Sequence, residues 1–264
     1  MLEAIEHVID WLHKLDLITM AIVVYVFWFT VMALIGVVVA LRARGPRLDA
    51  YRRISQNLLG TLMASFALYT ALLINSIWRD RSDAQHIVMQ EARAIEQSIM
   101  LSRHLSVPDR NELEVLLRDY VQVVVTREWP NLDEAGELPF AVPELREAME
   151  WVLSLKPAEG NDAFLRGQLV SEIGKIEQSR TRRLAIADQE ISIVVWITLI
   201  LSAIIVASAV AMVHVENKRT EALTLSLLAI LIGSAFWVLL AHDQPFVGTL
   251  IVSPQPLISA VNAL

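Results

Sequence analysis

The stretch AFWVLLAHDQPF, residues 235–246, contains the sharpest change of character in this chain. An apolar run ends there at His242 and Asp243. An aspartate at this point lies near the carbonyl end of a helix, where the macrodipole disfavours negative charge, and at a membrane edge, where a charge needs a partner. Pro245 stops the helix, Phe246 is expected to re-enter the membrane interface, and Gly248 permits the tight path that follows. We predict a structural corner formed by His242, Asp243, Pro245, Phe246 and Gly248.

The apolar run before the corner is one of four that are long enough to cross a membrane. A helix needs about 20 apolar residues to cross about 30 Å of hydrocarbon. Hydrophobic residues make up 55% of the 264 residues, too many for an ordinary soluble protein of this size, whereas 19% are charged, so part of the chain lies in water. The predicted spans are 17–41, 58–78, 191–213 and 222–241.

The remaining segments complete a five-part division of the chain. Residues 1–16 are acidic and amphipathic and lack a cationic start, so they are expected to form an interfacial helix anchored by Trp11 rather than a signal peptide. The spans occupy 17–78 and 191–241, an acidic helical extramembrane domain occupies 79–190, and the corner and tail occupy 242–264. The predicted fold class is therefore all-α, an integral membrane protein with a helical domain inserted between spans 2 and 3.

The inserted domain carries the net charge of the protein. It contains 21 Asp and Glu against 14 Lys and Arg, and the rest of the chain is balanced. This acidity argues against nucleic-acid binding. Ser106 followed by Pro108 marks a helix start, and Glu128-Trp129-Pro130 marks a helix end. From Phe164, apolar residues recur at near-heptad spacing, which favours a helix continuous with the third span.

The second span carries small and polar residues on one helical face. The interpretation as close helix packing and the interpretation as the wall of a water-filled pore both fit this pattern. The candidate pore-lining residues are Asn57, Thr61, Ser65, Tyr69 and Asn75.

Cations in the short loops predict the orientation. Loop 42–56 contains five arginines and loop 214–221 contains Lys218 and Arg219, so the positive-inside rule places both loops in the cytoplasm. Residues 79–190 and both termini then lie on the outer, periplasmic side of the cell inner membrane. Two spans separate residues 79–190 from the corner, so both lie at the same membrane face. This face carries the candidate partners of Asp243, which are Arg79, Arg81, Arg180, Arg182 and Arg183.

Motifs for catalysis and cofactor binding are absent from the sequence. The chain has no cysteine and no HExxH, GxGxxG, Walker-type, GxSxG or EF-hand pattern. The pairs Asp10/His13 and Asp83/His86 supply too few ligands to predict a metal site. His242 and Asp243 could handle a proton, but a capped helix end tied to an arginine explains them more simply. We expect no enzyme activity, cofactor or resident metal.

Three segments together resemble a family of bacterial membrane proteins described as bestrophin-like. They are the second span ending in Trp78, the segment from Tyr120 to Glu128-Trp129-Pro130, and His242-Asp243-Gln244-Pro245-Phe246-x-Gly248 with Val252-Ser253-Pro254. The resemblance implies four spans with a helical insert and an analogy to bestrophins, which are pentameric anion channels. No hydrophobic neck or calcium-clasp motif carries over. Bestrophins also keep the large segment in the cytoplasm, opposite to the orientation predicted here.

Two functional hypotheses follow. The first is a homo-oligomeric, anion-conducting channel with span 2 lining the pore, because four spans enclose little space alone. The second is a membrane-anchored sensor or interaction module that acts through the acidic domain. The expected partners are the lipid membrane, further copies of the chain and ions.

Overall fold

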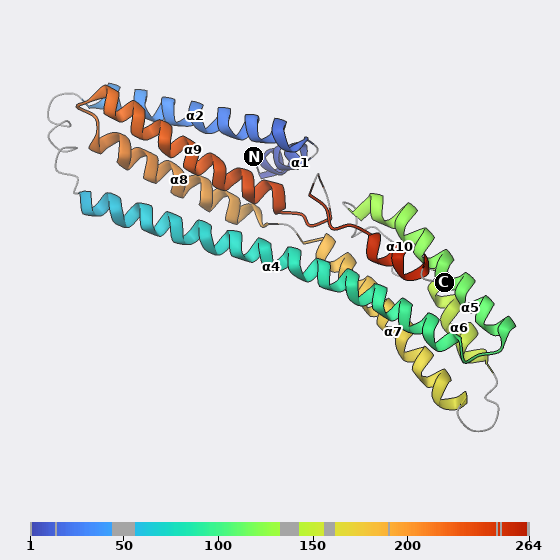
Figure 1. Cartoon of the computed structure of the whole chain (residues 1–264). Helices are drawn as coiled ribbons and strands as arrows, with labels where there is room; N and C mark the ends of the chain where they lie inside the picture. Colours follow the sequence, from blue (N-terminus) through green and yellow to red (C-terminus); the bar gives the residue numbers. More distant parts are fainter. Residues whose placement is uncertain are drawn as a thin grey trace. The chain divides into compact units, whose positions relative to one another are not determined.

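The computed structural model describes residues 2–13, 15–43, 56–132, 143–155, 162–189, 191–246, 248 and 250–262. Within these ranges all regular secondary structure is helical, as predicted (Figure 1). The chain divides into two compact units. The membrane unit comprises Met1–Arg79 and Ile191–Asp243, and the helical unit comprises Asp80–Glu190 and Gln244–Leu264.

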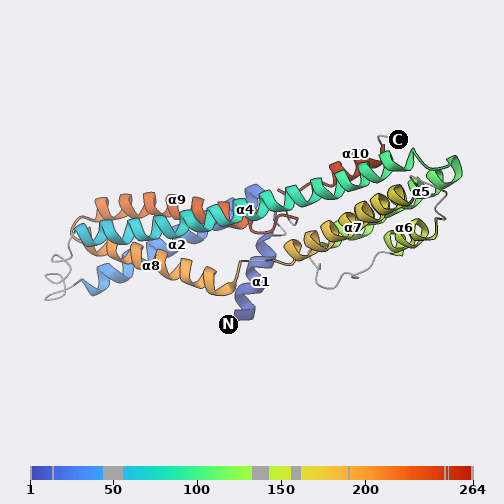
Figure 2. The same ribbon diagram turned by 90° about the horizontal axis from the view of Figure 1, so that it is seen from below.

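The membrane unit contains the four predicted spans. Helices α2 (Leu17–Arg42), α8 (Ile193–Val213) and α9 (Lys218–His242) are long and apolar enough to cross a membrane, and so is the part of α4 from Leu58 onward. Helix α1 (Leu2–His13) packs against α8 and α9, and α2, α8 and α9 pack against one another (Figures 1 and 2). This arrangement confirms the predicted class, an all-α membrane protein with four spanning helices.

Polar caps decide where the spanning helices begin. The Asp16 carboxylate accepts hydrogen bonds from the backbone N–H groups of Ile18 and Thr19, which starts α2. The Asn217 side chain does the same for Arg219 and Thr220. The fourth helix therefore starts at Lys218, about one turn before the predicted apolar limit.

Helix α4 (Gln56–Ser102) joins the second span to the first helix of the inserted domain. Its 47 residues extend about 70 Å at 1.5 Å per residue. The prediction of a continuous helix from the inserted domain into the third span is wrong, and the continuous junction is the one after the second span. Helix α7 ends at Ala187, and Ser192 caps a new helix at Ile193, so the helix is interrupted before the third span. No proline, glycine or cap interrupts α4 near Arg79 and Arg81.

Close packing of α2 against α9 holds the membrane unit together. The centre of the Phe236 ring lies 4.7 Å from the centre of the Trp28 ring and 6.0 Å from that of the Trp196 ring. A Cβ atom built on Gly233 would lie 2.8 Å from the Tyr25 ring. The Tyr25 hydroxyl is in turn hydrogen-bonded to the Ser234 hydroxyl at 2.8 Å, which limits how far the ring can move.

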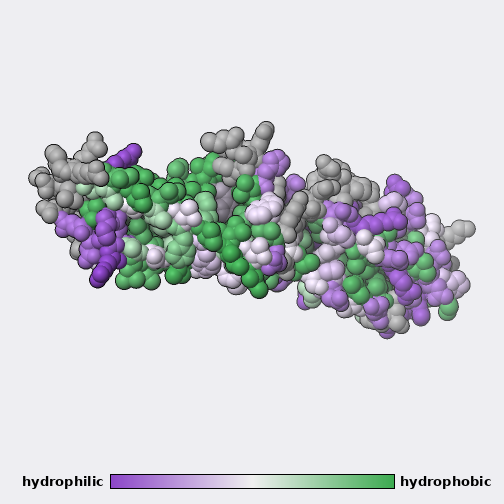
Figure 3. Space-filling view, turned by 90° about the horizontal axis from the view of Figure 1, so that it is seen from above, coloured by the Kyte–Doolittle hydropathy of each residue, from purple (hydrophilic) through white to green (hydrophobic). Residues whose placement is uncertain are grey.

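The helical unit is built from α5 (Val107–Val123), η1 (Val124–Glu128), α6 (Pro143–Ser154), α7 (Asp162–Ala187), α10 (Gln255–Asn262) and the second half of α4. Ser106 caps α5 with Pro108 in its first turn, as predicted. Helix α10 packs against α5 and was not predicted. Figure 3 shows hydrophilic colours over much of the helical unit and hydrophobic colours over much of the membrane unit.

Substituting Gly233 by alanine should destabilise the membrane unit. The added Cβ would force apart α2 and α9 against a ring held by Ser234, and overpacking of this kind costs about 1–3 kcal/mol. Melting of the purified protein in detergent measures the effect. Gly167→Ala in α7 is the control, because nothing lies within 4 Å of its Cβ position. Equal melting temperatures for the two variants would contradict the close contact.

Candidate functional site

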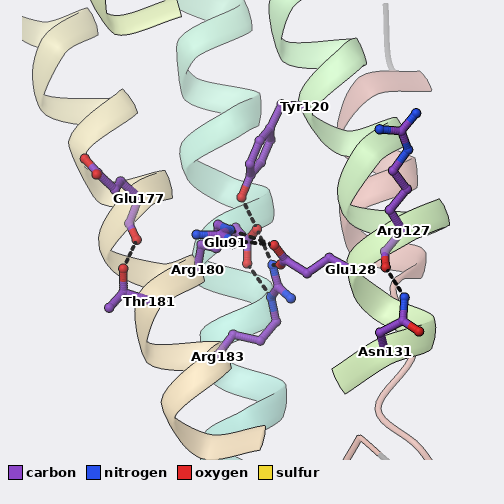
Figure 4. A network of polar contacts seen from close by, with 9 residues as sticks. All are labelled: Glu91, Tyr120, Arg127, Glu128, Asn131, Glu177, Arg180, Thr181 and Arg183. Atoms are coloured by element: carbon purple, nitrogen blue, oxygen red, sulfur yellow. Dashed lines mark hydrogen bonds and ion pairs between the residues drawn. The ribbon is translucent and has the colours of Figure 1, made fainter. Parts of the chain in front are cut away.

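Four charged side chains meet in the core of the helical unit. Glu91 comes from α4, Glu128 from η1, and Arg180 and Arg183 from α7 (Figure 4). Their exposed fractions are 0%, 5%, 2% and 0%. Two carboxylates and two guanidinium groups make the cluster neutral overall. Charges are tolerated at this depth only when they are paired and hydrogen-bonded.

Arg183 is the centre of this cluster. Its Nε donates to Glu91 Oε2 at 3.0 Å, and its Nη2 donates to Glu128 Oε1 at 2.7 Å and to Glu91 Oε1 at 3.3 Å. Arg180 lies 2.6 Å from Glu128 Oε2 through Nη2 and 2.8 Å through Nε. The Tyr120 hydroxyl donates to Glu91 Oε1 at 2.6 Å. The cluster therefore links α4, α5, η1 and α7.

A π-helical turn positions Glu128 for this contact. Residues Val124–Glu128 form η1, where the wider turn shifts the helical register relative to α5. Glu128 is buried, while Arg127 is exposed. Figure 4 shows the Arg127 side chain pointing away from the cluster, and its carbonyl accepts a hydrogen bond from Asn131 at 2.6 Å.

Aromatic rings close one side of the cluster. The Arg183 guanidinium carbon lies 4.9 Å from the centre of the Trp129 ring, a cation–π contact. Phe246 meets Trp129 edge to face at 5.7 Å and is 4% exposed. The prediction that Phe246 re-enters the membrane interface is therefore wrong, because its ring belongs to the core of the helical unit.

Burial and pairing shift two protonation equilibria in the same direction. Burial raises the pKa of the Tyr120 hydroxyl well above its ordinary value, and the negative charge of Glu91 raises it further. Burial lowers the pKa of the Arg183 guanidinium, but Glu91 and Glu128 outweigh this effect and hold that pKa above its ordinary value. Both shifts favour the protonated forms, a neutral Tyr120 hydroxyl and a charged Arg183 guanidinium.

The sequence analysis did not identify Glu91, Tyr120 or Glu128 as partners. A signal was nevertheless present on α7, where Arg180 and Arg183 continue the buried positions Leu169, Ile173 and Ile176 at steps of four and three. On α4 the same steps connect the buried residues Ala84, Val88, Glu91, Ile95, Ser98 and Ser102. A charged residue that falls on a heptad seam predicts a buried ion pair.

The corner at the end of α9 has contacts within the membrane unit. Asp243 is 7% exposed, accepts a hydrogen bond from the Ile191 N–H at 3.1 Å, and lies 3.8 Å from His13 Nε2. His242 stacks on Trp78 at 5.9 Å between ring centres. His13 was not predicted as a partner, although four spans place the predicted interfacial helix 1–16 at the same membrane face as the corner.

The arginines proposed for Asp243 occupy different environments. Arg183 binds Glu91 and Glu128 instead, and Arg81 donates to the Leu250 carbonyl. Arg79 and Arg182 are exposed, and Arg180 is buried against Glu128. Pairing of Asp243 with an arginine stays a prediction.

The remaining corner residues shape the backbone after α9. Pro245 and Phe246 are buried in the helical unit. Gly248 has a φ of 88°, which favours glycine, as the predicted tight path requires. The carbonyl of Pro245 accepts a hydrogen bond from the Val252 N–H at 2.8 Å.

The predicted stripe on the second span lies mostly on one exposed face of α4. Thr61, Ser65 and Asn75 are exposed in the protomer, and Tyr69 is half-buried. The side chain of Asn57 lies outside the described residues. Only 11% of the apolar window of α4 is buried, compared with 44% for α9. This helix therefore presents most of its surface outward.

Metal binding has no support in the described part of the chain, where no group of three or more His, Asp or Glu side chains is arranged to hold an ion. Asp83 and His86 are both exposed on α4. The side chain of Asp10 lies outside the described residues.

Glu91→Gln should destabilise the helical unit by about 3–5 kcal/mol, because it leaves a buried guanidinium without its full counter-charge. Thermal unfolding of the full chain in detergent measures this loss. Glu150→Gln is the matched control, since Glu150 is 71% exposed and 3.9 Å from Arg146, and should cost less than about 1 kcal/mol. A loss at Glu91 no larger than at Glu150 would refute the role of the cluster.

Alkaline pH should destabilise the protein through Tyr120. Because its folded pKa is raised, its contribution is complete below the unfolded tyrosine pKa of about 10 and is lost as pH rises toward the folded pKa. Wild type should therefore lose melting temperature more steeply than Tyr120→Phe as pH is raised beyond about 10. Parallel curves for the two proteins would show that Tyr120 does not titrate with unfolding.

Comparisons with known proteins agree with this architecture. The sequence model of the bestrophin-like domain matches residues 25–257. Two crystal structures of a bacterial bestrophin homologue from Klebsiella pneumoniae, a leucine-to-threonine and a tyrosine-to-alanine variant, align with TM-scores of 0.65 and 0.63. Each is 12% identical and covers 90% of this chain and 95% of the homologue.

No curated protein matches this sequence. At 12% identity the structural similarity establishes the fold alone. The family match extends over most of the chain, from the first span to α10. The chain belongs to the bestrophin-like family.

Proposed function

We propose that this protein forms a homo-oligomeric anion channel in which α4 lines a central pathway. The observation that carries the proposal is the small and polar face that α4 leaves exposed within the membrane. Gly60, Thr61, Ser65 and Asn75 are all exposed, and a Cβ atom on Gly60 would meet nothing within 4 Å. Polar side chains within the membrane require protein or water around them.

A comparison with α2 separates this face from an ordinary lipid-facing surface. Most of the exposed side chains of α2 are bulky and apolar, including Ile18 at 72%, Ile22 at 58% and Val26 at 60% exposure, although Thr19, Thr30 and Ala33 are exposed as well. Such residues suit hydrocarbon. The exposed face of α4 also contains Leu68 and Leu72, but between them and around them it carries small or polar groups.

A ring of copies would satisfy this face. Four spans in one protomer enclose little space, and a closed symmetric assembly brings the same helix of each copy to the axis. Thr61, Ser65 and Asn75 would then line a pathway wide enough for water. The alternative is close packing of α4 against a neighbouring copy without a pore. It uses the same face of α4, and a measurement of conductance distinguishes it from the channel.

Charge at the end of the stripe favours anions. Arg79 follows Asn75 by four residues, so the two share a helical face, and both are exposed. In an oligomer, a ring of arginines at the mouth of a pore concentrates anions. The family relationship supports the same assignment, since bestrophins are anion channels.

Location in the cell inner membrane is part of the proposal. Arg42 at the end of α2 and Lys218 at the start of α9 mark the cytoplasmic ends of these helices under the positive-inside rule. The N-terminus and residues 79–190 then lie in the periplasm, opposite to the bestrophin arrangement. The chain has no cysteine, so single cysteines introduced at chosen positions and labelled from each side of the membrane measure the orientation directly.

Bilayer recording from the purified oligomer tests the function. Wild type should conduct anions, Ser65→Leu and Thr61→Leu should strongly reduce conductance by blocking the pathway, and Arg79→Glu should shift the reversal potential toward cations. Ile22→Leu is the control, because it conserves volume on the exposed apolar face of α2. Silent bilayers from a correctly assembled oligomer would refute the channel and leave the interaction module as the functional hypothesis.

A further inference from the structure

A pocket lies between α2 and α9 near the end of the membrane unit formed by the α8–α9 connection. Its volume is about 330 Å³, within the range of small-molecule sites. The walls are largely apolar and converge on one charged pair. Its defining residues are Met32, Ala33, Gly36, Lys218, Glu221 and Leu225.

Glu221 supplies an unused acceptor to this pocket. The side chain belongs to the first turn of α9 and is 3% exposed. Its Oε2 binds Lys218 Nζ at 2.5 Å, but its Oε1 has no hydrogen-bond partner among the described residues. A buried carboxylate oxygen without a donor is costly, so a ligand that donates a hydrogen bond here gains stability.

Gly36 creates the space in front of this oxygen. A Cβ atom at Gly36 would lie 3.6 Å from Glu221 Oε1 and 3.2 Å from a Leu225 methyl group. Almost any side chain at this position would therefore fill the approach to the carboxylate. The pocket between α2 and α9 therefore places the Glu221 carboxylate at the end of an apolar groove.

The outer surface beside the pocket is suited to lipid. Phe29 and Val37 line the pocket and are 41% and 56% exposed, and the neighbouring Leu223 is 62% exposed. An isolated inorganic cation would gain little from these apolar walls. A ligand with a hydrocarbon chain and a cationic head matches both parts of the site.

We propose that this pocket binds a phospholipid whose head group carries a primary ammonium. The ammonium donates to Glu221 Oε1, and the Lys218 ammonium, whose side chain is 60% exposed, faces the phosphate. The start of one acyl chain follows the apolar wall along Met32 and Val37. The site is separate from the exposed face of α4 and does not depend on channel activity.

Lipid binding to the delipidated full-length protein, measured by native mass spectrometry, tests the proposal. Phosphatidylethanolamine should bind about tenfold more tightly than phosphatidylglycerol, which has no amine, or phosphatidylcholine, whose quaternary amine cannot donate. Glu221→Gln should abolish this preference, because it removes the negative charge that pairs with the ammonium. Equal binding of all three lipids by wild type would overturn the proposal.

Two further variants keep the test decisive if Glu221→Gln does not fold. Ala222→Phe fills the pocket from its exposed rim and should lose the preference, whereas Leu223→Phe, on the adjacent exposed position outside the pocket, should retain it. Loss in both variants, or in neither, would contradict the site. Soluble phosphoethanolamine should not compete at equal concentration. Effective competition would show that the acyl chain plays no part and would refute the lipid assignment.

Discussion

The buried guanidinium of Arg183 is the constraint on which the helical unit depends. It has no exposed surface, so it can remain charged only while Glu91 and Glu128 surround it. These carboxylates come from segments 92 and 55 residues away in the chain. The helical unit therefore has to bring three distant segments together before all of these charges are paired, which favours a single specific packing.

The local irregularity at η1 serves the same constraint. A regular continuation of α5 would give Glu128 a different rotation about the helix axis, and the π-turn places it against Arg180 and Arg183. Trp129 then lies next to the cluster, against Arg183 on one side and Phe246 on the other. The segment after the last span is in this way tied into the core of the helical unit.

Helix α4 gives the two units a common element with two different surfaces. Beyond Ala84 its buried residues follow a heptad seam that contains Glu91. Before Arg79 most of its residues are exposed, and the polar ones among them have no place in lipid. Glu221, between α2 and α9, is a second polar side chain in an apolar setting, and its Oε1 has no hydrogen-bond partner among the described residues. In our proposals, further copies of the chain cover the polar face of α4, and a lipid head group binds Glu221.

The sequence by itself determined the all-α class, the four spans and the start of α5 at Ser106, because these depend on hydrophobicity over a window and on capping groups a few residues away. Only the tertiary structure decided which junction is continuous, where Phe246 packs, and that Arg183 binds Glu91 and Glu128. Pairing between distant charges depends on which helix faces meet. The faces that meet are set by all the tertiary contacts acting together, so local sequence patterns do not reveal them.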